Sequence, residues 1–418
     1  MEYIKRLSEK KLEFYLSTFK SVAIVGPKFS GKTTLAKRFA KSDIYLTSLN
    51  IDENKTILQL NPGLFFTGDK PKLIDEWQLI PEVWDLVRHQ VDKEKGRGLY
   101  ILTCSSAANL DKTRHSGAGR IGRMIVRPMS LFETSVSSGE ASLSDLLDGK
   151  KFDSFKSNVS VEEYAKWIIK GGWPEGIYDT EKQAISKNRA YLDALVKEDV
   201  NKVTDKTYNE LRMRKIIESL ARNTASEATN VSIESDVKAM DESISQNTLV
   251  DYLDVLNKLY IIEDLKAWNP NLRSKAVIRT SPARFFVDPS IGAASLGLTS
   301  TRLLSDFKTF GLFFEALVLR DIRVYADVNQ GEVYRYKDSS GLEIDMIVEL
   351  DDGRWGAFEI KMGSHQLDQA AMNLHKLADN IDETKMMKPS FLAIITATEY
   401  AYRREDGVLV IPLALLRD

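Results

Sequence analysis

The sequence predicts an α/β protein made of several domains, and three observations lead to this fold class. Near the N-terminus, an apolar run is followed by a glycine-rich loop and then by a helical pattern. In the middle of the chain, residues 161–222 show helical spacing of apolar side chains. After about residue 305 the pattern reads helix, three strands, helix and strand. At 418 residues the chain is too long for one ordinary core, so we expect two to four domains.

Composition narrows the class of protein. The chain is 43% hydrophobic and 28% charged, and it has no run of about 18 apolar residues, so we expect no membrane span. Its single cysteine, Cys104, cannot form an internal disulfide, which favours a reducing compartment and a cytoplasmic location. Four histidines and one cysteine argue against a structural zinc site. The net charge of −2 neither indicates nor excludes nucleic-acid binding, because local patches matter more than the sum.

The glycine-rich loop carries the most specific signal. It lies between the apolar run at residues 21–25 and a helical pattern, which is the strand–loop–helix context of a P-loop. The loop fits G-x-x-x-x-G-K-[ST], and with the threonine after it supplies the expected nucleotide ligands: Gly26, Pro27, Lys28, Phe29, Ser30, Gly31, Lys32, Thr33 and Thr34. Glycines let backbone N–H groups close around phosphate at a helix N-terminus. We therefore expect ATP, with Lys32 on the β- and γ-phosphates and Thr33 on Mg²⁺; a chance match is the alternative.

A second apolar strand, residues 72–74, runs straight into two acids, Asp75 and Glu76. This arrangement places one carboxylate near the metal and the other beside the γ-phosphate. We expect Asp75 to hold Mg²⁺ through water and Glu76 to polarise the attacking water. A surface turn that happens to contain two acids is the alternative.

A third strand, residues 99–104, finishes in hydroxyl side chains. It resembles the sensor strand of the AAA+ ATPases, in which a polar side chain hydrogen-bonds the attacking water or the γ-phosphate. Ser105 is the candidate sensor and Thr103 the second choice. Hydroxyls also end many strands as simple caps, which is the competing interpretation.

The block from residue 115 to residue 133 extends this resemblance. It reads HSGAGRIGR and then MIVRPMSLFE, and it is similar to the glycine–arginine segment of AAA-type ATPases of the AAA_14/DUF4143 family. GGWPE at residues 171–175 and RFFVDP at residues 284–289 belong to the same resemblance, which spans nearly the whole chain.

In AAA+ relatives an arginine before the fifth strand reaches the γ-phosphate of a neighbouring subunit. Arg120 and Arg123 occupy that place here, so the resemblance implies a homo-oligomer in which one of them acts catalytically in trans. A flexible basic loop that touches its own nucleotide, or nothing, is the alternative.

The middle of the chain resembles a helical lid or connector followed by a winged helix. Two helices, the second over residues 246–259, lead into a strand at residues 260–265 and a basic loop with Arg273, Lys275 and Arg279. The second helix carries Asp251 and Asp254 against one lysine, Lys258, whereas a helix that enters a DNA groove should be basic. We therefore expect a packing role for this helix, with the loop cations left as candidate phosphate contacts.

The αβββαβ order at the C-terminus resembles the PD-(D/E)XK nuclease-like core. The turn at Asp351 and Asp352 with Gly353 suits a three-residue hairpin loop that pairs Leu350 with Arg354. Alternate residues of a strand share a face. This register places Asp345 directly across from Glu359, with Lys361 two residues further on.

Glu315 lies in an apolar stripe of the preceding helix, and a carboxylate there should be neutralised or bound. By resemblance it is the helix acid of a nuclease site, in which Asp345 and Glu359 hold Mg²⁺ or Mn²⁺ and Glu315 completes the ligand shell. Lys361 then orients the water, and Gln369 supports the site. A charged hairpin surface with Lys361 as a salt-bridge partner is the alternative.

These expectations divide the chain into four parts. They are an AAA+-like ATPase domain (1–150), a helical lid (151–230), a winged-helix-like domain (231–300) and a DUF4143 nuclease-like domain (301–418). The expected function is an ATPase that acts on DNA through a nucleotide-gated, metal-dependent nuclease-like site. The alternative is an ATP-switched scaffold that binds nucleic acid or protein without cutting it.

Overall fold

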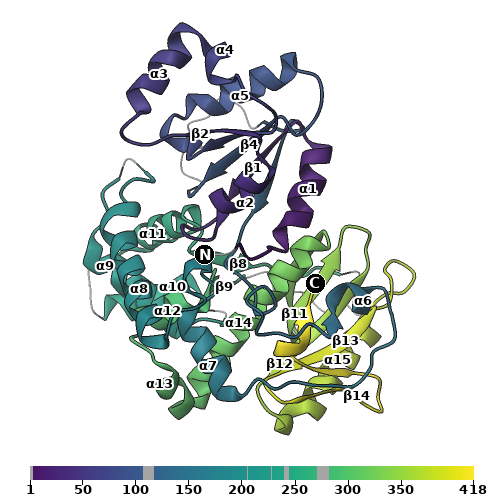
Figure 1. Ribbon diagram of the computed structural model, residues 1–418. Coiled ribbons are helices and arrows are strands. Elements are labelled where there is room, and N and C mark those ends of the chain that lie inside the picture. The colour runs from purple at the N-terminus through teal and green to yellow at the C-terminus, as the bar shows by residue number, and fades with distance from the viewer. Residues whose placement is uncertain (1–2, 107–116, 205, 227, 240–243, 271–281) are drawn as a thin grey trace.

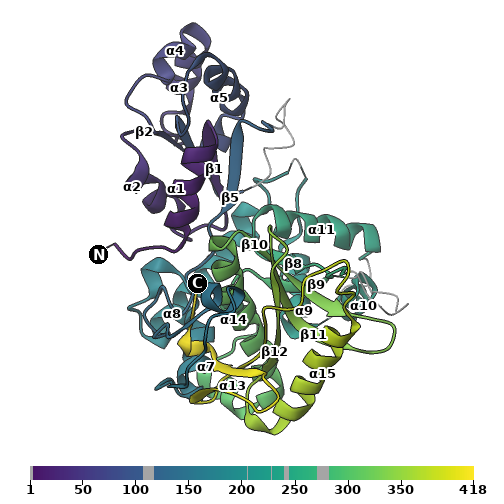
Figure 2. The same cartoon turned by 90° about the vertical axis from the view of Figure 1, so that its right-hand side faces the viewer.

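The computed structural model describes residues 3–106, 117–204, 206–226, 228–239, 244–270 and 282–418. Figures 1 and 2 show one body formed by the N-terminal part of the chain and a second that holds the central helices and the C-terminal sheet. The predicted loop residues Arg273, Lys275 and Arg279 lie outside the described residues. No helix in the described ranges is long and apolar enough to cross a membrane.

The first body is a five-stranded parallel sheet with the strand order β2-β3-β4-β1-β5. Its strands are β1 (Ser21–Val25), β2 (Ser42–Tyr45), β3 (Lys72–Asp75), β4 (Tyr100–Cys104) and β5 (Ile121–Ile125). Its helices are α1 (Ser8–Thr18), α2 (Lys32–Phe39), α3 (Ile51–Leu60), α4 (Pro62–Phe65) and α5 (Glu82–Lys93). The three strands expected from the sequence are confirmed, and β4 lies between β1 and β3.

Apolar side chains cover both faces of this sheet, as a parallel sheet requires. Along β1, Val22 and Ile24 pack with Leu12 of α1 and with α2, whereas Ala23 and Val25 pack towards Trp84 of α5. All strands point the same way, so their carboxyl ends meet at one edge. The P-loop, Asp75 and Ser105 therefore leave the sheet side by side.

The second body begins with helices and a short hairpin. Its elements are α7 (Val161–Lys170), α8 (Glu181–Ala194), α9 (Glu210–Arg222), α10 (Asn230–Lys238), α11 (Gln246–Lys258), β8 (Ile262–Leu265), β9 (Ala283–Phe286), α12 (Pro289–Ser295) and α13 (Ser300–Ser305). Each helix from α7 to α14 begins after a Ser, Thr, Asn or Asp whose side chain accepts a backbone N–H, which fixes where it starts. The predicted order of two helices and an antiparallel hairpin is confirmed by α10, α11, β8 and β9.

The C-terminal part contains a seven-stranded mixed sheet with the order β10-β11-β12-β13-β15-β14-β7. Its elements are α14 (Phe307–Val328), β10 (Gly331–Lys337), β11 (Glu343–Leu350), β12 (Trp355–Lys361), α15 (Leu367–Asn380), β13 (Phe391–Thr396), β14 (Tyr400–Arg403) and β15 (Leu409–Pro412). The predicted αβββαβ element order is confirmed. Helix α14 packs against Val348 and Phe358, and α15 packs against Trp355 and Ala357 on the opposite face.

A segment from early in the chain completes this C-terminal sheet. Strand β7 (Phe155–Lys156) pairs with β14, and β6 (Ala141–Ser142) pairs with β16 (Leu416–Arg417). Helix α6 (Leu143–Leu147) also packs into the core around α14. Residues 141–156 therefore pack with the C-terminal part of the chain, and the four-part division with a first domain ending at residue 150 stays a prediction.

Candidate functional site

The P-loop has the backbone geometry that its glycines predict. Gly26 (φ 144°) and Gly31 (φ 89°) have positive φ angles, and so does Phe29 (φ 64°). A Cβ on Gly26 would lie 2.4 Å from the carbonyl oxygen of Val126, so no side chain fits there. Helix α2 begins at Lys32, and its first N–H groups have no partners within the helix. The loop therefore presents free backbone donors at a positive helix end, where phosphate binds.

The side chain of Lys32 folds back over this loop. Its ammonium donates to the carbonyl oxygen of Pro27 at 2.7 Å, and the side chain is buried. Burial lowers the pKa of Lys32 to about 8, although the carboxylates of Glu76 and Asp75 oppose the shift. Keeping the Lys32 ammonium charged in this buried position therefore costs desolvation free energy, which a bound phosphate would offset.

The residues expected to hold Mg²⁺ are in direct contact. The Thr33 hydroxyl donates to Asp75 Oδ1 at 2.8 Å, and the hydroxyl of Thr103 on β4 donates to the same oxygen. Asp75 ends β3 and is buried. A hydroxyl and a carboxylate are oxygen ligands of the kind Mg²⁺ prefers, so these residues fit the ion.

Glu76 lies beside them in an unusual backbone conformation. Its φ is 54°, in the left-handed region that non-glycine residues seldom adopt, and its N–H donates to Thr103 Oγ1 at 3.3 Å. Its carboxylate accepts hydrogen bonds from the Ser105 hydroxyl at 3.0 Å and from Gln78. The two sensor candidates therefore differ in the carboxylate they contact: the Ser105 hydroxyl donates to that of Glu76, whereas the Thr103 hydroxyl donates to that of Asp75. Gln78 belongs to no motif, and its only signal in the sequence is its place two residues after Glu76.

The two candidate trans arginines lie away from their own P-loop. Ile121 pairs with Ser21 at the start of β1, and Arg120 precedes it, whereas the P-loop follows the other end of that strand. Five residues of strand separate the two ends by about 16 Å. Arg120 forms a half-exposed ion pair with Asp92 at 2.6 Å, and the Arg123 guanidinium lies 5.0 Å from the ring centroid of Trp84. Arg120 thus lies at the end of the sheet opposite its own P-loop, and its role in trans stays a prediction.

Arg6 supports the P-loop through a hydrogen bond to its backbone, and no motif in the sequence indicates this role. Its guanidinium donates to the carbonyl oxygens of Ser30 and Arg127, each at 2.8 Å. It also pairs with the carboxylate of Glu133 at 2.8 Å, with both side chains nearly fully buried. The contacts with Arg127 and Glu133 join residues more than 100 positions apart, which no local pattern could indicate.

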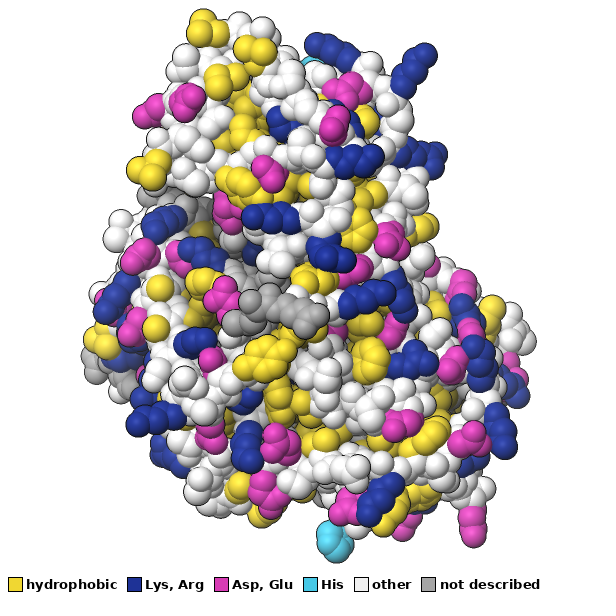
Figure 3. All heavy atoms as spheres, in the orientation of Figure 1, with side chains coloured by type: hydrophobic (Ala, Val, Ile, Leu, Met, Phe, Trp, Pro, Cys, Tyr) yellow, Lys and Arg dark blue, Asp and Glu magenta, His cyan; other side chains and the backbone are white. Residues whose placement is uncertain are grey.

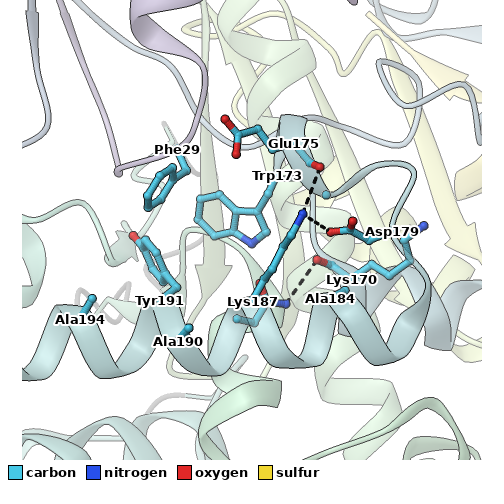
Figure 4. A pocket seen from close by; sticks show the side chains of 12 residues that line it. Phe29, Lys170, Trp173, Glu175, Asp179, Ala184, Lys187, Ala190, Tyr191 and Ala194 are labelled. Atoms are coloured by element: carbon cyan, nitrogen blue, oxygen red, sulfur yellow. Dashed lines mark hydrogen bonds and ion pairs between the residues drawn. The ribbon is translucent and has the colours of Figure 1, made fainter. Parts of the chain in front are cut away.

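The central helices reach the other side of the P-loop. Lys28, expected among the nucleotide ligands, instead directs its ammonium to Asp199 at 2.5 Å. A Cβ on Gly31 would lie 3.4 Å from the side chain of Pro174, so the segment 171–175 lies against the loop. Figure 4 shows Phe29 of the loop facing Trp173 and Tyr191. Thr34, the last expected ligand, is exposed on the first turn of α2.

At the C-terminus the predicted hairpin register is confirmed. Leu350 N–H donates to Arg354 O at 2.8 Å, Gly353 has φ 86°, and Met346 pairs with Phe358. The register brings the predicted side chains together. Lys361 Nζ lies 2.7 Å from Glu359 Oε2 and 3.3 Å from Asp345 Oδ2.

The predicted Gln369 and an unpredicted side chain, Asn373, extend this cluster. Asn373 donates to Glu359 at 3.1 Å, and Gln369 donates to Asn373 at 3.0 Å, so Gln369 supports the cluster through one intermediate residue. Burial, and then the charge of Asp345, raise the pKa of Glu359 to about 7 and raise the pKa of Glu315 well above its usual value.

Two observations bear on the expected metal site. Glu315 as a whole residue is partly exposed, although burial of its carboxyl group is the largest cause of its raised pKa. Within the described residues, no group of three or more His, Cys, Asp and Glu side chains is close enough to hold a metal ion. The ammonium of Lys361 lies between Asp345 and Glu359.

Three protein-family models match successive parts of the chain. Residues 18–135 match the AAA domain model, residues 161–302 match a domain of unknown function (DUF8612), and residues 310–416 match another (DUF4143). The chain thus carries an AAA-type domain around the P-loop, and this match supports binding and hydrolysis of ATP. No curated protein matches the chain.

Several solved structures are similar to the chain, and three of them are given with the share of this chain and of their own chain that is covered. The Walker-type ATPase paby2304 of Pyrococcus abyssi is 14% identical and covers 70% of this chain and 96% of its own, with a TM-score of 0.44. The replication initiator DnaA bound to AMPPCP and single-stranded DNA is 15% identical (60% and 86%; TM-score 0.27). The FIGL-1 AAA domain in complex with ADP is 16% identical (61% and 77%; TM-score 0.22).

Proposed function

We propose that the chain binds ATP at the P-loop and hydrolyses it with Glu76. The observation that carries this proposal is the meeting of Thr33, Asp75, Glu76 and Ser105 at one edge of the sheet. Four side chains from three different segments converge beside a loop that presents free N–H groups. A surface turn with two acids would not place them against Thr33 and Ser105.

The roles follow from the contacts. Lys32 and the loop amides bind the phosphates, and Thr33 with Asp75 would hold Mg²⁺, which neutralises phosphate charge as it develops. Glu76 orients the attacking water and accepts its proton, while Ser105 fixes the Glu76 carboxylate at 3.0 Å. Thr103 holds Asp75 in place from the neighbouring strand.

ATP binding and turnover test the proposal directly. Lys32→Ala should weaken ATP binding by roughly ten- to hundredfold, because it removes a charged donor to phosphate. Lys37→Ala is the matched control, because Lys37 lies on the same helix but is exposed and faces Tyr45. Equal ATP affinity in the two variants would contradict the assignment of the site.

We also propose that the active form is a homo-oligomer, in which Arg120 of one subunit completes the site of the next. Its place supports this proposal, since it precedes β5 at the end of the sheet opposite its own P-loop. Arg120 is half exposed and held only by Asp92 among the described residues, and an exposed pair of this kind is weak. A neighbouring phosphate can therefore compete for it.

The C-terminal cluster supports a second candidate function, metal-dependent cleavage of DNA. The supporting observation is that Asp345, Glu359 and Lys361 converge in the predicted register beside Glu315, whose pKa is raised. Mg²⁺ or Mn²⁺ would then displace the Lys361 ammonium, and the freed lysine would orient water. The competing proposal is an ATP-switched scaffold that binds nucleic acid or protein without cutting.

Surface charge bears on this choice. On the face in Figure 3, acidic and basic side chains are interspersed, and this face has no continuous basic stripe of the kind that binds a nucleic-acid backbone.

The deciding experiment incubates supercoiled plasmid with Mg²⁺ or Mn²⁺, with and without ATP. Asp345→Ala is the test variant, and Asp351→Ala, exposed at the tip of the same hairpin, is its control. If Asp345→Ala still cleaves the plasmid, or if the wild-type protein does not cleave it, the nuclease proposal fails and the ATP-switched scaffold is the remaining proposal.

A further inference from the structure

The P-loop is tied to the C-terminal end of α8 by an ion pair between Lys28 and Asp199. The ammonium of Lys28 lies 2.5 Å from Asp199 Oδ1. The Lys28 side chain is 42% exposed, whereas that of Asp199 is only 9% exposed. Neither side chain forms another ion pair within the described ranges. A mobile lysine of the loop therefore supplies the counter-charge of a nearly buried carboxylate.

The local structure of α8 fixes the position of this carboxylate. The segment Leu195–Asp199 continues α8 as one π-helical turn, in which the Val200 N–H donates to the carbonyl oxygen of Leu195 at 3.1 Å. Single π-turns are rare in helices and are frequent at functional sites. The Leu195 side chain is buried in the core of the central helices, so it anchors the turn. Asp199 is thus held against the loop, while the long side chain of Lys28 keeps its freedom.

The Lys28 ammonium also lies near the place where phosphate is expected. Burial is the main cause of the lowered pKa of Lys32, and the positive charge of Lys28 contributes to it as well. The two ammonium groups are therefore close enough to repel one another. Because Lys28 belongs to the loop and has a flexible four-carbon stem, a phosphate bound by the loop amides would attract it.

We infer that Asp199 is a positioning residue of the ATP site, which competes with the phosphates for Lys28. The inference rests on the proposed binding of ATP at the P-loop. In the nucleotide-free protein, Asp199 holds the Lys28 ammonium away from the loop. When phosphate binds, Lys28 turns towards it and leaves the Asp199 carboxylate nearly buried without a counter-charge, which costs free energy. Asp199 therefore lowers the affinity for ATP, and by linkage ATP weakens the contact between the loop and the end of α8.

Isothermal titration of the full chain with a non-hydrolysable ATP analogue and Mg²⁺ measures this competition. Asp199→Asn should raise the affinity for the analogue by about fivefold or more, because Lys28 is then free to bind phosphate. Inorganic tripolyphosphate should show the same gain, because the lysine binds phosphate and not the base. Glu198→Gln is the matched control, because Glu198 is exposed on the same turn and pairs with Lys202. Its affinity for the analogue should stay within about twofold of wild type.

A double-mutant cycle tests whether Asp199 acts through Lys28. In an Asp199→Asn background, Lys28→Met should weaken binding of the analogue by about tenfold. In the wild-type background its effect should be much smaller, because there the lysine must first leave its partner. If the ion pair were only a structural tether, Asp199→Asn would leave the affinity unchanged or lower it, and either result overturns the inference. An equal gain from Asp199→Asn in the Lys28→Met background also overturns it, since the carboxylate would then repel phosphate directly.

Hydrogen exchange of the wild-type protein gives a test that needs no variant. The amides of residues 195–203 should exchange faster when the analogue is bound, because the contact of Asp199 with the loop is lost. Slower or unchanged exchange in this segment overturns the inference, even if Asp199→Asn fails to fold. If the wild-type protein binds neither the analogue nor tripolyphosphate, the proposed function itself fails.

Discussion

The guanidinium of Arg320 lies 3.1 Å from the carboxylate of Asp288, and both side chains are fully buried. Asp288 also accepts the N–H of Gly172 at 2.9 Å, beside the segment that packs on the P-loop. Arg320 pairs with Asp321 as well, whose carboxylate accepts the N–H of Leu131 at 2.9 Å. This network joins GGWPE and RFFVDP to α14, the helix that carries Glu315. The two sequence blocks therefore meet in a shared ion network that links the P-loop to the C-terminal sheet.

Removing the cation from this network should destabilise the protein strongly. Arg320→Met leaves Asp288 and Asp321 buried without a counter-charge, which costs about 3–5 kcal/mol. Urea denaturation of the full chain measures the loss. Arg302→Met is the control, because Arg302 is exposed on α13, and its effect should stay within about 0.5 kcal/mol. Similar stability of the two variants would show that the buried pair contributes little.

ATP affinity should fall as pH rises above about 8. In the free protein burial lowers the pKa of Lys32 to about 8, so the ammonium loses its proton above that pH. Bound phosphate favours the charged form, so binding must then take up a proton, and affinity falls by up to about tenfold per pH unit. Titration calorimetry at pH 8.5 in buffers of different ionisation heat measures the uptake.

The lowered pKa of Lys32 also makes the free energy of unfolding of the nucleotide-free protein depend on pH. An unfolded chain keeps the Lys32 proton to pH 10.5, so the folded state binds fewer protons between about 8 and 10.5, and stability rises with pH there. Lys32→Arg removes the titration, because arginine stays charged. If ATP binding takes up the same number of protons in wild type and in Lys32→Arg, the protons bind to a group other than Lys32.

Glu76→Gln should bind ATP and hydrolyse it slowly. A glutamine can still accept the Ser105 hydrogen bond, but it cannot accept the proton of the attacking water, which reduces kcat by about a hundredfold or more. A phosphate-release assay at saturating ATP measures it. Glu82→Gln, an exposed acid at the start of α5, should match wild type. Unchanged turnover in Glu76→Gln would leave the water-positioning role to another side chain.

Turnover per subunit should rise with protein concentration, because Arg120 is expected to act on a neighbouring subunit. Arg120→Ala should lose about a thousandfold in kcat and keep its ATP affinity. Mixing Arg120→Ala with Lys32→Ala should restore part of the activity, since each variant supplies what the other lacks. Asp92→Ala frees Arg120 from its partner and should leave turnover near wild type. A proven monomer with full turnover would refute the trans role.

Added Mn²⁺ should raise the melting temperature of the nucleotide-free protein by about 2–5 °C. In Asp345→Asn this rise should shrink, because an amide is a poorer ligand for a hard cation. The metal-free variant should lose one source of the raised pKa of Glu359, since the charge of Asp345 contributes to it. The full chain is the right sample, because β7 and β6 complete the C-terminal structure. Asp351→Asn is the control. If millimolar Mn²⁺ leaves the melting temperature of the wild-type protein unchanged, the cluster is an ion-pair network and not a metal site.

Local patterns are sufficient for the parts of the site that lie next to one another in the chain. A strand, a glycine loop and a helix follow without a gap, so their spacing alone assigns Lys32 and Thr33 to the phosphates and the metal. Asp75 and Glu76 end a strand, and strand direction alone sends them to the phosphate edge of a parallel sheet. The C-terminal register is also predictable, because a three-residue hairpin loop fixes which residues of β11 and β12 oppose one another.

The sequence by itself therefore determined the two sites as sets of residues, because spacing within a strand, a hairpin or a helix N-terminus is a short-range property. Only the tertiary structure decided what supports them and how they are joined. The order of the sheet placed Thr103 against Asp75 and carried Arg120 to the end opposite the P-loop. Folding also brought Arg6 to Glu133 and Gly172 to Asp288, each across more than 100 residues. Such contacts depend on how whole layers pack, and no periodicity along the chain encodes them.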